Sequence, residues 1–365
     1  MNTEKSLLEN KSHFYFDILN GFADAIRILN ENNQVIFVND SMLMLMGANV
    51  GAMYCTFDNP FCNLDVTAKS LETGAVIERE SDIDGRTYLI KTSPIRNDFS
   101  DIVGVVEIFR DISREKRLNR ELKNQNIQLI DEMQRAEKIQ EAILPEKGFY
   151  KNLKLSYVYE PESQLSGDMI DVFEIDEDNV GVYISDTVGH GFSASMVTMS
   201  VSQAFKNMDL KRLLNPNLAL KDLCHRFTSL GLGIEIYLTC FYAVLNVKTG
   251  QISYSNAGHA PCPLLFSDNE VKVLESSGFP ISPFFENVDY SVNKAKFFTG
   301  DKILFMTDGC VDGLSPSREP YSLKRVMSLV PALKGNIIEQ LFSDIRNYIN
   351  TVQIDDMTLM LMECF

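Results

Sequence analysis

Two apolar segments joined by a short polar turn are the feature that most constrains how this chain can fold. Residues 168–175 and 180–185 are rich in β-branched and aromatic side chains, and the polar residues 176–179 separate them. This pattern predicts a β-hairpin. Asp168 begins the first strand and Asp186 follows the second, so antiparallel pairing would bring the two acids together. Like charges at short range are unfavourable unless a cation lies between them. Solvated turn acids are the alternative interpretation.

Acidic residues at the ends of apolar runs recur in the C-terminal half. Residues 302–307 form an apolar run that stops at Asp308, and Asp355 and Asp356 come shortly before the run 359–362. Carboxylate oxygens without clustered His or Cys indicate Mg²⁺ or Mn²⁺ rather than Zn²⁺. Two such ions could hold a bridging water and bind the oxygens of a phosphoryl group. The sequence therefore predicts a phosphoryl-transfer site built from carboxylates.

Length and charge narrow the class of protein. A chain of 365 residues predicts two or three domains. The net charge of −16 argues against nucleic-acid binding, which needs a basic patch, and against anionic membranes. No basic and then apolar leader begins the sequence, and no apolar run could span a bilayer. Seven cysteines without framework spacing fit a reducing compartment, so we expect a cytoplasmic protein.

The first domain is expected at residues 13–112, after a tail of residues 1–12. Two β-rich runs, a mixed helical region and three further β-rich runs follow one another, at residues 25–30, 35–39, 75–80, 87–94 and 102–110. This order, together with the amino-acid sequence of residues 24–29, 38–41 and 105–113, resembles the PAS family. The resemblance implies a sensory or dimerising role, and the ligand stays unknown.

A helical linker is expected at residues 113–144. Residues 114–144 contain no Gly or Pro, and apolar side chains recur every seven residues at Leu122, Leu129, Ala136 and Ile143. Leu118 and Ile139 add a second seam position that Gln125 and Glu132 interrupt. The pattern predicts a weak coiled coil in a homodimer, ended by Pro145. A single amphipathic helix lying on its own domain is the alternative.

The third segment, residues 145–365, alternates β-rich runs with helical patterns. The order predicts an α+β sandwich of antiparallel strands rather than a doubly wound sheet. The short motifs in this segment and at the end of the linker are residues 136–145, 166–168, 186–191, 256–261, 307–309 and 355–358. In this order they resemble the SpoIIE/RsbU branch of the PPM-type, metal-dependent Ser/Thr protein phosphatases. The resemblance implies an α-β-β-α sandwich of two antiparallel sheets flanked by helices.

The resemblance also implies roles at a centre that holds two Mn²⁺ or Mg²⁺ ions. The residues concerned are Asp168, Asp186, Thr187, Asp308, Asp355 and Asp356. Asp186 would bridge the ions, and the Thr187 carbonyl would bind one of them. Asp308 and Asp355 would hold the other ion. Asp168 would contact the pair directly or through water, and Asp356 would orient Asp355 or bind metal. A water held by the metals would attack phosphorus without a covalent enzyme intermediate.

Two departures from related eukaryotic phosphatases concern proton transfer and phosphate binding. Val188 stands where those proteins place a proposed general-acid His, and His190 is offset from that position. No counterpart of their phosphate-binding Arg is evident before Asp168, so the general acid is unassigned. His259 is expected to brace a loop rather than to transfer protons.

The expected substrate is a phosphoserine or phosphothreonine protein, typically a STAS-type anti-sigma-factor antagonist in a partner-switching pathway. A catalytically silent sensor or binding module of the same fold is the main alternative. A histidine kinase is disfavoured because the linker has no His. A diguanylate cyclase is disfavoured because residues 166–171 lack the Gly-Gly-Asp/Glu-Glu-Phe pattern and Asp308 and Asp355 would have no purpose.

Overall fold

The computed structural model divides the chain into two compact units. The structure describes residues 14–46, 64–189, 191–267, 270–285, 288–349 and 355–365. The N-terminal unit is Met1–Gln128 and the C-terminal unit is Leu129–Phe365. The expected tail of residues 1–12, together with His13 and His190, lies outside the described residues. No helix in the described ranges is long and apolar enough to cross a membrane.

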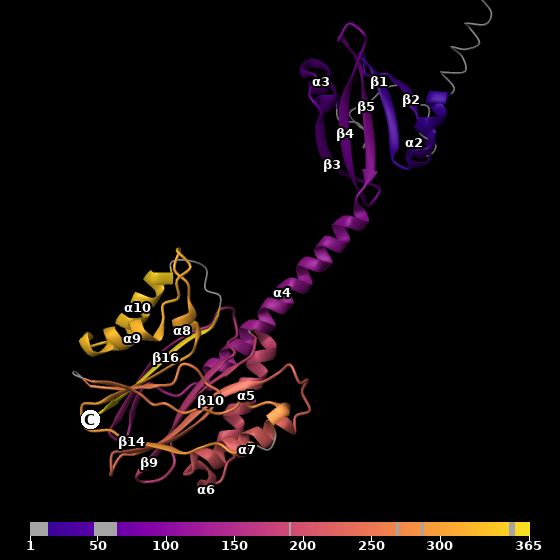
Figure 1. Cartoon of the computed structure of the whole chain (residues 1–365). Coiled ribbons are helices and arrows are strands. Elements are labelled where there is room, and N and C mark those ends of the chain that lie inside the picture. Colours follow the sequence, from indigo (N-terminus) through magenta and orange to yellow (C-terminus); the bar gives the residue numbers. More distant parts are fainter. Residues whose placement is uncertain (1–13, 47–63, 190, 268–269, 286–287, 350–354) are drawn as a thin grey trace, which may run out of the picture. The chain divides into compact units, whose positions relative to one another are not determined.

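The N-terminal unit is built on one antiparallel sheet of five strands in the order β2-β1-β5-β4-β3 (Figure 1). The strands are β1 (Ala25–Asn30), β2 (Val35–Val38), β3 (Ile77–Ile83), β4 (Arg86–Arg96) and β5 (Ile102–Asp111). The helices are residues 14–20, α2 (Asp40–Met46) and α3 (Leu64–Thr73). The expected order of two strands, helices and three strands is therefore present. The first strand, β1, pairs with the last strand, β5, at the centre of the sheet.

An ion pair lies inside the N-terminal unit. Arg27 and Glu107 face each other on β1 and β5 and are almost completely buried. Arg27 Nε donates to Glu107 Oε2 at 2.6 Å. The guanidinium also lies 5.2 Å from the centre of the Phe109 ring. A buried pair of this kind does little for net stability but leaves a costly charge if either partner is removed.

A long helix, α4 (Ser113–Glu141), follows β5 and continues past the boundary between the two units. Its apolar side chains at Leu118, Leu122, Leu129 and Ile139 are exposed in the single chain. Helical hydrogen bonding ends before the expected limit at residue 144. The amides of Ile143 and Leu144 instead donate to carbonyls three residues earlier, a tightened final turn of the kind that ends many helices.

The C-terminal unit contains two antiparallel sheets. Five strands form the sheet β14-β11-β10-β9-β8 and six form the sheet β13-β12-β15-β16-β7-β6. The first sheet contains β8 (Asp168–Glu174), β9 (Asn179–Thr187), β10 (Leu238–Asn246), β11 (Gln251–Ala257) and β14 (Asn293–Lys296). The second contains β6 (Gly148–Tyr150), β7 (Leu153–Glu160), β12 (Leu264–Phe266), β13 (Val271–Val273), β15 (Lys302–Met306) and β16 (Met357–Cys364).

Helices cover the outer face of each sheet. One face carries α5 (Phe192–Lys206), α6 (Leu210–Leu213) and α7 (Pro216–Thr228), and the other carries α8 (Gly309–Asp312), α9 (Leu323–Leu329) and α10 (Ile337–Ile349) (Figure 1). A third apolar core lies between the sheets and includes Ile184, Phe241, Phe305 and Met360. The predicted α-β-β-α sandwich is therefore confirmed as a fold of antiparallel sheets between helices. The sequence pattern does not predict β6, α6 or α8, which are all only three or four residues long.

Candidate functional site

The β8–β9 hairpin places its two acids side by side. Asp168 and Asp186 are direct partners in the antiparallel register. The turn is fixed by Asp176, whose Oδ1 accepts hydrogen bonds from the backbone amides of Asp178 and Asn179, both at 2.9 Å. Such Asp-centred turns set strand register locally. The predicted hairpin and its pairing of acids are confirmed.

Asp168 is held between the two sheets. Its side chain is buried, and Oδ2 accepts hydrogen bonds from the hydroxyls of Thr307 at 2.9 Å and Thr358 at 2.6 Å. Thr307 follows β15 and Thr358 lies on β16, so the Asp168 carboxylate links the β8 edge of one sheet to two central strands of the other. Burial, and then the charges of Asp186 and Asp356, raise the pKa of Asp168 well above its ordinary value.

Asp355 and Asp356 are neighbours in sequence but face different surroundings. Asp356 is buried, and its two oxygens accept from the backbone amides of Glu162 at 2.7 Å and Gly167 at 2.6 Å. Asp356 therefore holds the loop that leads into Asp168. Asp355 is exposed, and its Oδ1 accepts from the Asp356 amide at 2.9 Å.

Gly309 allows the segments that carry Asp308 and Asp355 to approach each other. A Cβ atom at Gly309 would overlap the carbonyl oxygen of Asp356 and would lie 3.3 Å from Cβ of Asp355. Only Gly fits such a close backbone approach. Asp308 precedes Gly309 at the start of α8, where its side chain makes no capping hydrogen bond.

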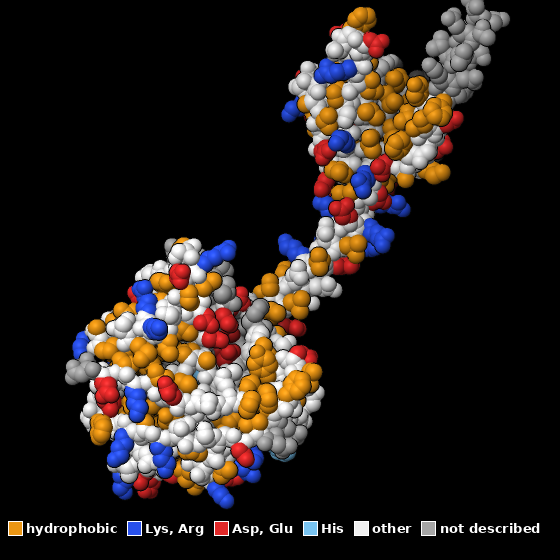
Figure 2. Space-filling view, in the orientation of Figure 1, with side chains coloured by type: hydrophobic (Ala, Val, Ile, Leu, Met, Phe, Trp, Pro, Cys, Tyr) orange, Lys and Arg blue, Asp and Glu red, His pale blue; other side chains and the backbone are white. Residues whose placement is uncertain are grey.

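The acids raise one another's pKa values. Burial, and then the charges of Asp308, Asp355 and Asp356, raise the pKa of Asp186 to about 8. Burial, Asp355 and Asp312 raise the pKa of Asp308. Figure 2 shows acidic side chains gathered on the surface of the C-terminal unit between α8 and α5. A local excess of negative charge lies at this end of the sandwich.

This donor set fits divalent cations. Asp186 and Asp308 are half-buried and Asp355 is exposed, so the carboxylates lie between the core and solvent. Hard oxygen ligands of this type suit Mg²⁺ and Mn²⁺. Thr187 Oγ1, next to Asp186, is buried and has no hydrogen-bond partner among the described residues. The acids interact through charge, yet within the described ranges no three acidic, His or Cys side chains converge into a ready-made metal cluster.

The last turn of α4 contacts the segment that precedes Asp168. The buried Gln140 side chain donates from Nε2 to the Ser166 carbonyl at 2.8 Å and accepts at Oε1 from the Ser166 amide at 3.0 Å. The backbone N–H and C=O of Ser166 are thereby both satisfied by one amide side chain. The position of Ser166, two residues from Asp168, therefore depends on where α4 ends.

His259 joins two strands from opposite sheets. Its Nε2 lies 3.1 Å from the Met306 carbonyl on β15, and Nδ1 lies 3.2 Å from the Thr239 hydroxyl on β10. Because a carbonyl can only accept, Nε2 carries the proton and Nδ1 accepts from Thr239. Burial lowers the pKa of His259 to about 4, so the ring is neutral. Thr239 pairs with Asp186 and Met306 lies two residues before Asp308, so His259 braces the strands of both acids.

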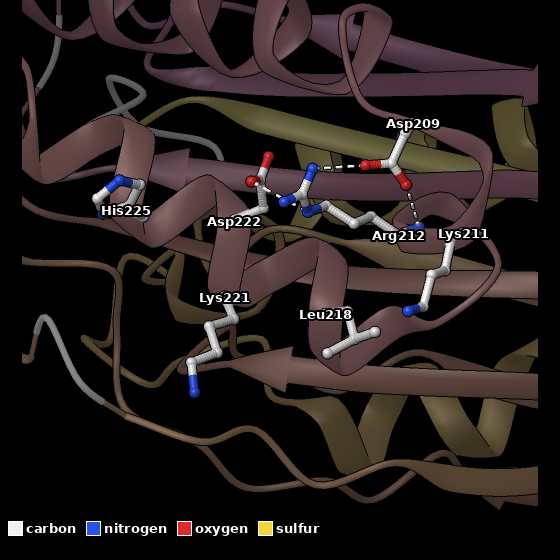
Figure 3. Close-up of a pocket in the computed structure, with 7 residues that line it drawn as sticks. All are labelled: Asp209, Lys211, Arg212, Leu218, Lys221, Asp222 and His225. Atoms are coloured by element: carbon white, nitrogen blue, oxygen red, sulfur yellow. Dashed lines mark hydrogen bonds and ion pairs between the residues drawn. The ribbon is translucent and has the colours of Figure 1, made fainter.

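A separate cavity of about 610 Å³ lies beside α6 and α7. Figure 3 shows Arg212 between Asp209 and Asp222, and Asp222 also pairs with Arg226. Lys221 on the same wall pairs with Asp289. These charges compensate one another, and none of the sequence-predicted site residues lines the cavity. The group of acids around Asp186 is therefore a better candidate for an active site than this cavity.

Sequence reasoning missed the residues that hold the acids in place. Thr307 and Thr358 occurred within recognised motifs but were given no role, and Gln140 was noted only as part of a helical motif. A polar side chain next to an apolar run is the sequence feature that could have indicated such a role, because buried polar groups need hydrogen-bond partners. Val188, which follows Asp186 and Thr187, is exposed and offers no titratable group.

Comparison with known proteins identifies the C-terminal unit. The model of the family described as Stage II sporulation protein E (SpoIIE) matches residues 176–365. The chain belongs to the SpoIIE family. This is a PPM/PP2C-type serine/threonine phosphatase family, as the sequence motifs predicted.

Relatives of the SpoIIE unit include two Bacillus subtilis proteins. Phosphoserine phosphatase RsbP is 29% identical over 184 residues, which are 50% of this chain and 45% of RsbP. Phosphoserine phosphatase RsbU is 26% identical over 162 residues, covering 44% of this chain and 47% of RsbU. The chain thus spans about half the length of these curated relatives.

Two solved structures share the fold. The SiaA-PP2C domain of Pseudomonas aeruginosa has a TM-score of 0.57 at 18% identity, covering 66% of this chain and 98% of that domain. The phosphatase domain of SpoIIE from Bacillus subtilis, with a fragment of its regulatory domain, has a TM-score of 0.51 at 14% identity. That match covers 99% of this chain and 90% of the other. At these identities the structures establish the fold alone.

Asp355→Asn should weaken metal binding, whereas Asp356→Asn should weaken the fold. Asp356→Asn replaces one acceptor oxygen by an amide group that faces a backbone N–H, so the free energy of unfolding should fall by about 2–4 kcal/mol. Asp355→Asn changes an exposed group, so unfolding should change by less than about 0.5 kcal/mol while Mn²⁺ affinity falls. Urea unfolding and calorimetric Mn²⁺ titration measure the two effects. Equal destabilisation by both variants would contradict the assigned roles.

His259→Gln should flatten one part of the dependence of stability on pH. The pKa of this ring is about 4 in the folded chain, below the ordinary 6.5, so the unfolded chain binds the proton first. Keeping the buried ring neutral adds to the free energy of unfolding. This contribution is fully present above pH 6.5 and is lost as the pH falls toward 4. The loss should be about 3 kcal/mol.

Urea unfolding across that range should show a steeper decline in the wild type than in His259→Gln. His225→Gln, which removes an exposed His from α7, is the matched control. Identical slopes in the wild type and His259→Gln would show that the ring is not buried in its neutral form.

Proposed function

We propose that the C-terminal unit hydrolyses phosphoserine or phosphothreonine esters on a protein, with Mn²⁺ or Mg²⁺ as cofactor. The observation that carries this proposal is the pairing of Asp168 with Asp186 beside Asp308 and Asp355, whose charges raise the pKa of Asp186. Membership of the SpoIIE family supports it. So does the name phosphoserine phosphatase carried by two relatives.

Each proposed metal ligand has its own place in a centre of two ions. Asp186 would be shared by the two ions of the centre. The Thr187 carbonyl would bind one ion, and Asp308 and Asp355 would hold the other. Asp168 would contribute directly or through water, with Oδ2 already fixed by two hydroxyls. Asp356 would keep the loop before Asp168 in place rather than bind an ion, because both of its oxygens accept backbone hydrogen bonds.

The chemistry depends on concentrating negative groups that only a cation can balance. Bound divalent ions supply charge that polarises a phosphoryl oxygen and lowers the pKa of water. The protein contributes fixed positions: Thr307 and Thr358 orient Asp168, and neutral His259 sets the spacing of the strands that carry the other acids. Positioning of this kind accounts for much of catalysis in phosphoryl transfer.

A protein substrate is supported by the surroundings of Asp186. Val188, Phe192 and Met196 follow this acid, and all three are exposed apolar residues. Phe192 and Met196 are one helical turn apart on α5 and share a face. Apolar surface beside charged groups suits contact with a protein more than with a small phosphate ester. On the family resemblance we propose a STAS-type antagonist of an anti-sigma factor as the partner, in a partner-switching pathway.

The apolar seam and the final turn of α4 support a regulatory role for this helix. We propose that the N-terminal unit is a PAS-type sensor, and that α4 pairs with a second copy of the chain through Leu118, Leu122 and Leu129. A shift of α4 would move Gln140, and with it the Ser166 peptide and the approach to Asp168. The proposed assembly is a homodimer whose linker controls the order of the metal site.

Asp186→Asn should abolish metal-dependent phosphate release. The bridging carboxylate is lost, so release from a phosphoserine STAS-type protein in Mn²⁺ should fall about 100-fold or more. Asp178→Asn makes the same change at the far end of the hairpin and should retain activity. Release that requires Mn²⁺ but survives Asp186→Asn would contradict the assignment. Absence of both Mn²⁺ binding and release in wild-type protein would favour the silent binding module.

Leu122→Lys should weaken the dimer. A Lys at this seam position would place two like charges against each other in a parallel pair, so sedimentation velocity should show a shift toward monomer. Asn124→Lys adds the same charge two residues away, off the seam, and should leave the dimer intact. A wild-type chain that stays monomeric at high micromolar concentration would contradict pairing through α4.

A further inference from the structure

One face of the N-terminal sheet carries three charged side chains among apolar ones. Arg27 on β1, Glu107 on β5 and Thr92 on β4 are successive partners across the register. Arg79 on β3 pairs with Ile90, which pairs with Phe109 in the adjacent row. Along β3, alternate residues are more buried than their neighbours, and Arg79 belongs to the more buried set. Two arginines and one glutamate therefore share this face.

Glu107 is fully engaged without Arg79. Its Oε2 accepts from Arg27 Nε at 2.6 Å, and its Oε1 accepts from the Thr92 hydroxyl at 3.1 Å. The Thr67 hydroxyl on α3 approaches the same Oε1 at 3.5 Å. Arg27 neutralises Glu107, so the charge of Arg79 is left unmatched among the groups that the structure describes on this face.

Arg79 presents two buried nitrogens without partners. Nε and Nη2 are inaccessible to solvent and make no hydrogen bond in the described part of the chain. Burial lowers the pKa of Arg79, an effect that the charge of Glu107 opposes and that of Arg27 reinforces. A buried donor without an acceptor costs free energy comparable to a lost hydrogen bond, and native structures seldom leave one unfilled. Nε and Nη2 are adjacent, and together they form the edge of a guanidinium that binds both oxygens of a carboxylate.

We propose that Arg79 binds the carboxylate of a small organic acid inside the N-terminal unit. One carboxylate would balance the unmatched charge and satisfy both free donors. The side chains of Ile77, Ile83 and Ile90 lie on the same sheet face and would contact an aliphatic part of the acid. A free small molecule suits the site better than an acidic side chain of a partner protein, because the two nitrogens are shielded from the surface. This binding site does not depend on the phosphatase activity proposed above.

Hydrogen exchange of the full-length chain tests the proposal. Acetate, propionate, butyrate and succinate are added as sodium salts, and sodium chloride serves at equal ionic strength. Propionamide has the shape of propionate without its charge and is the neutral control. Mass spectrometry follows exchange in peptides from β3 and β4. At least one carboxylate should slow exchange there, with no effect from chloride or propionamide.

Variants at Arg79 identify the binding group. Arg79→Gln should remove the protection, and Arg79→Lys, which keeps the charge but not the paired donors, should weaken binding about 10- to 100-fold. Lys91→Gln removes a positive charge from the exposed Lys91–Glu78 pair on the same two strands and should bind like the wild type.

Three results would overturn the carboxylate site. The first is that no carboxylate in the panel protects β3 and β4 of the wild-type chain more than chloride does. The second is protection that persists in Arg79→Gln, which would place any bound acid elsewhere. The third is equal protection by propionamide, which would assign the effect to apolar contact. The wild-type comparison decides the matter even if Arg79→Gln fails to fold.

Discussion

The Asp168 carboxylate is buried between two sheets, and the arrangement of the other acids depends on how it is held. Its Oδ2 accepts hydrogen bonds from Thr307 and Thr358, which belong to the opposite sheet. Asp356 makes a second polar link between the sheets through the Gly167 amide, and His259 makes a third between β10 and β15. Apolar packing between sheets has little directional preference, whereas these hydrogen bonds fix one alignment. They cluster at the end of the sandwich where the acids lie.

The same end of the fold carries an electrostatic cost. Asp186 has its pKa raised to about 8 by burial and by three other acids, so ionised carboxylates destabilise this region. Stable proteins keep such arrangements where binding compensates the cost, which is why raised carboxyl pKa values cluster at functional sites. Gly309 permits the close approach, and Gln140 couples the last turn of α4 to the peptide before Asp168. The start of β8 is thus held by contacts from α4 and from the opposite sheet.

Local patterns predicted most of the elements. Turn residues between two β-rich runs predicted the β8–β9 hairpin, and the absence of Gly and Pro predicted α4. Contacts between segments that are distant in the sequence could not be predicted from local patterns. Thr307 and Thr358 lie 139 and 190 residues from Asp168, and Arg27 lies 80 residues from Glu107. The family motifs named the acids, but only the fold distinguishes Asp356, which holds a loop, from Asp355, which faces solvent.

The central claim is that Asp186, Asp308 and Asp355 together hold divalent cations at the end of the sandwich. Anomalous diffraction from crystals of the chain grown with Mn²⁺ tests this most directly, because the anomalous signal locates manganese without reference to activity. The account predicts two peaks beside these three carboxylates, with Asp186 shared between them. Ordered crystals that show no peak there, or manganese only in the cavity beside α6 and α7, would contradict it.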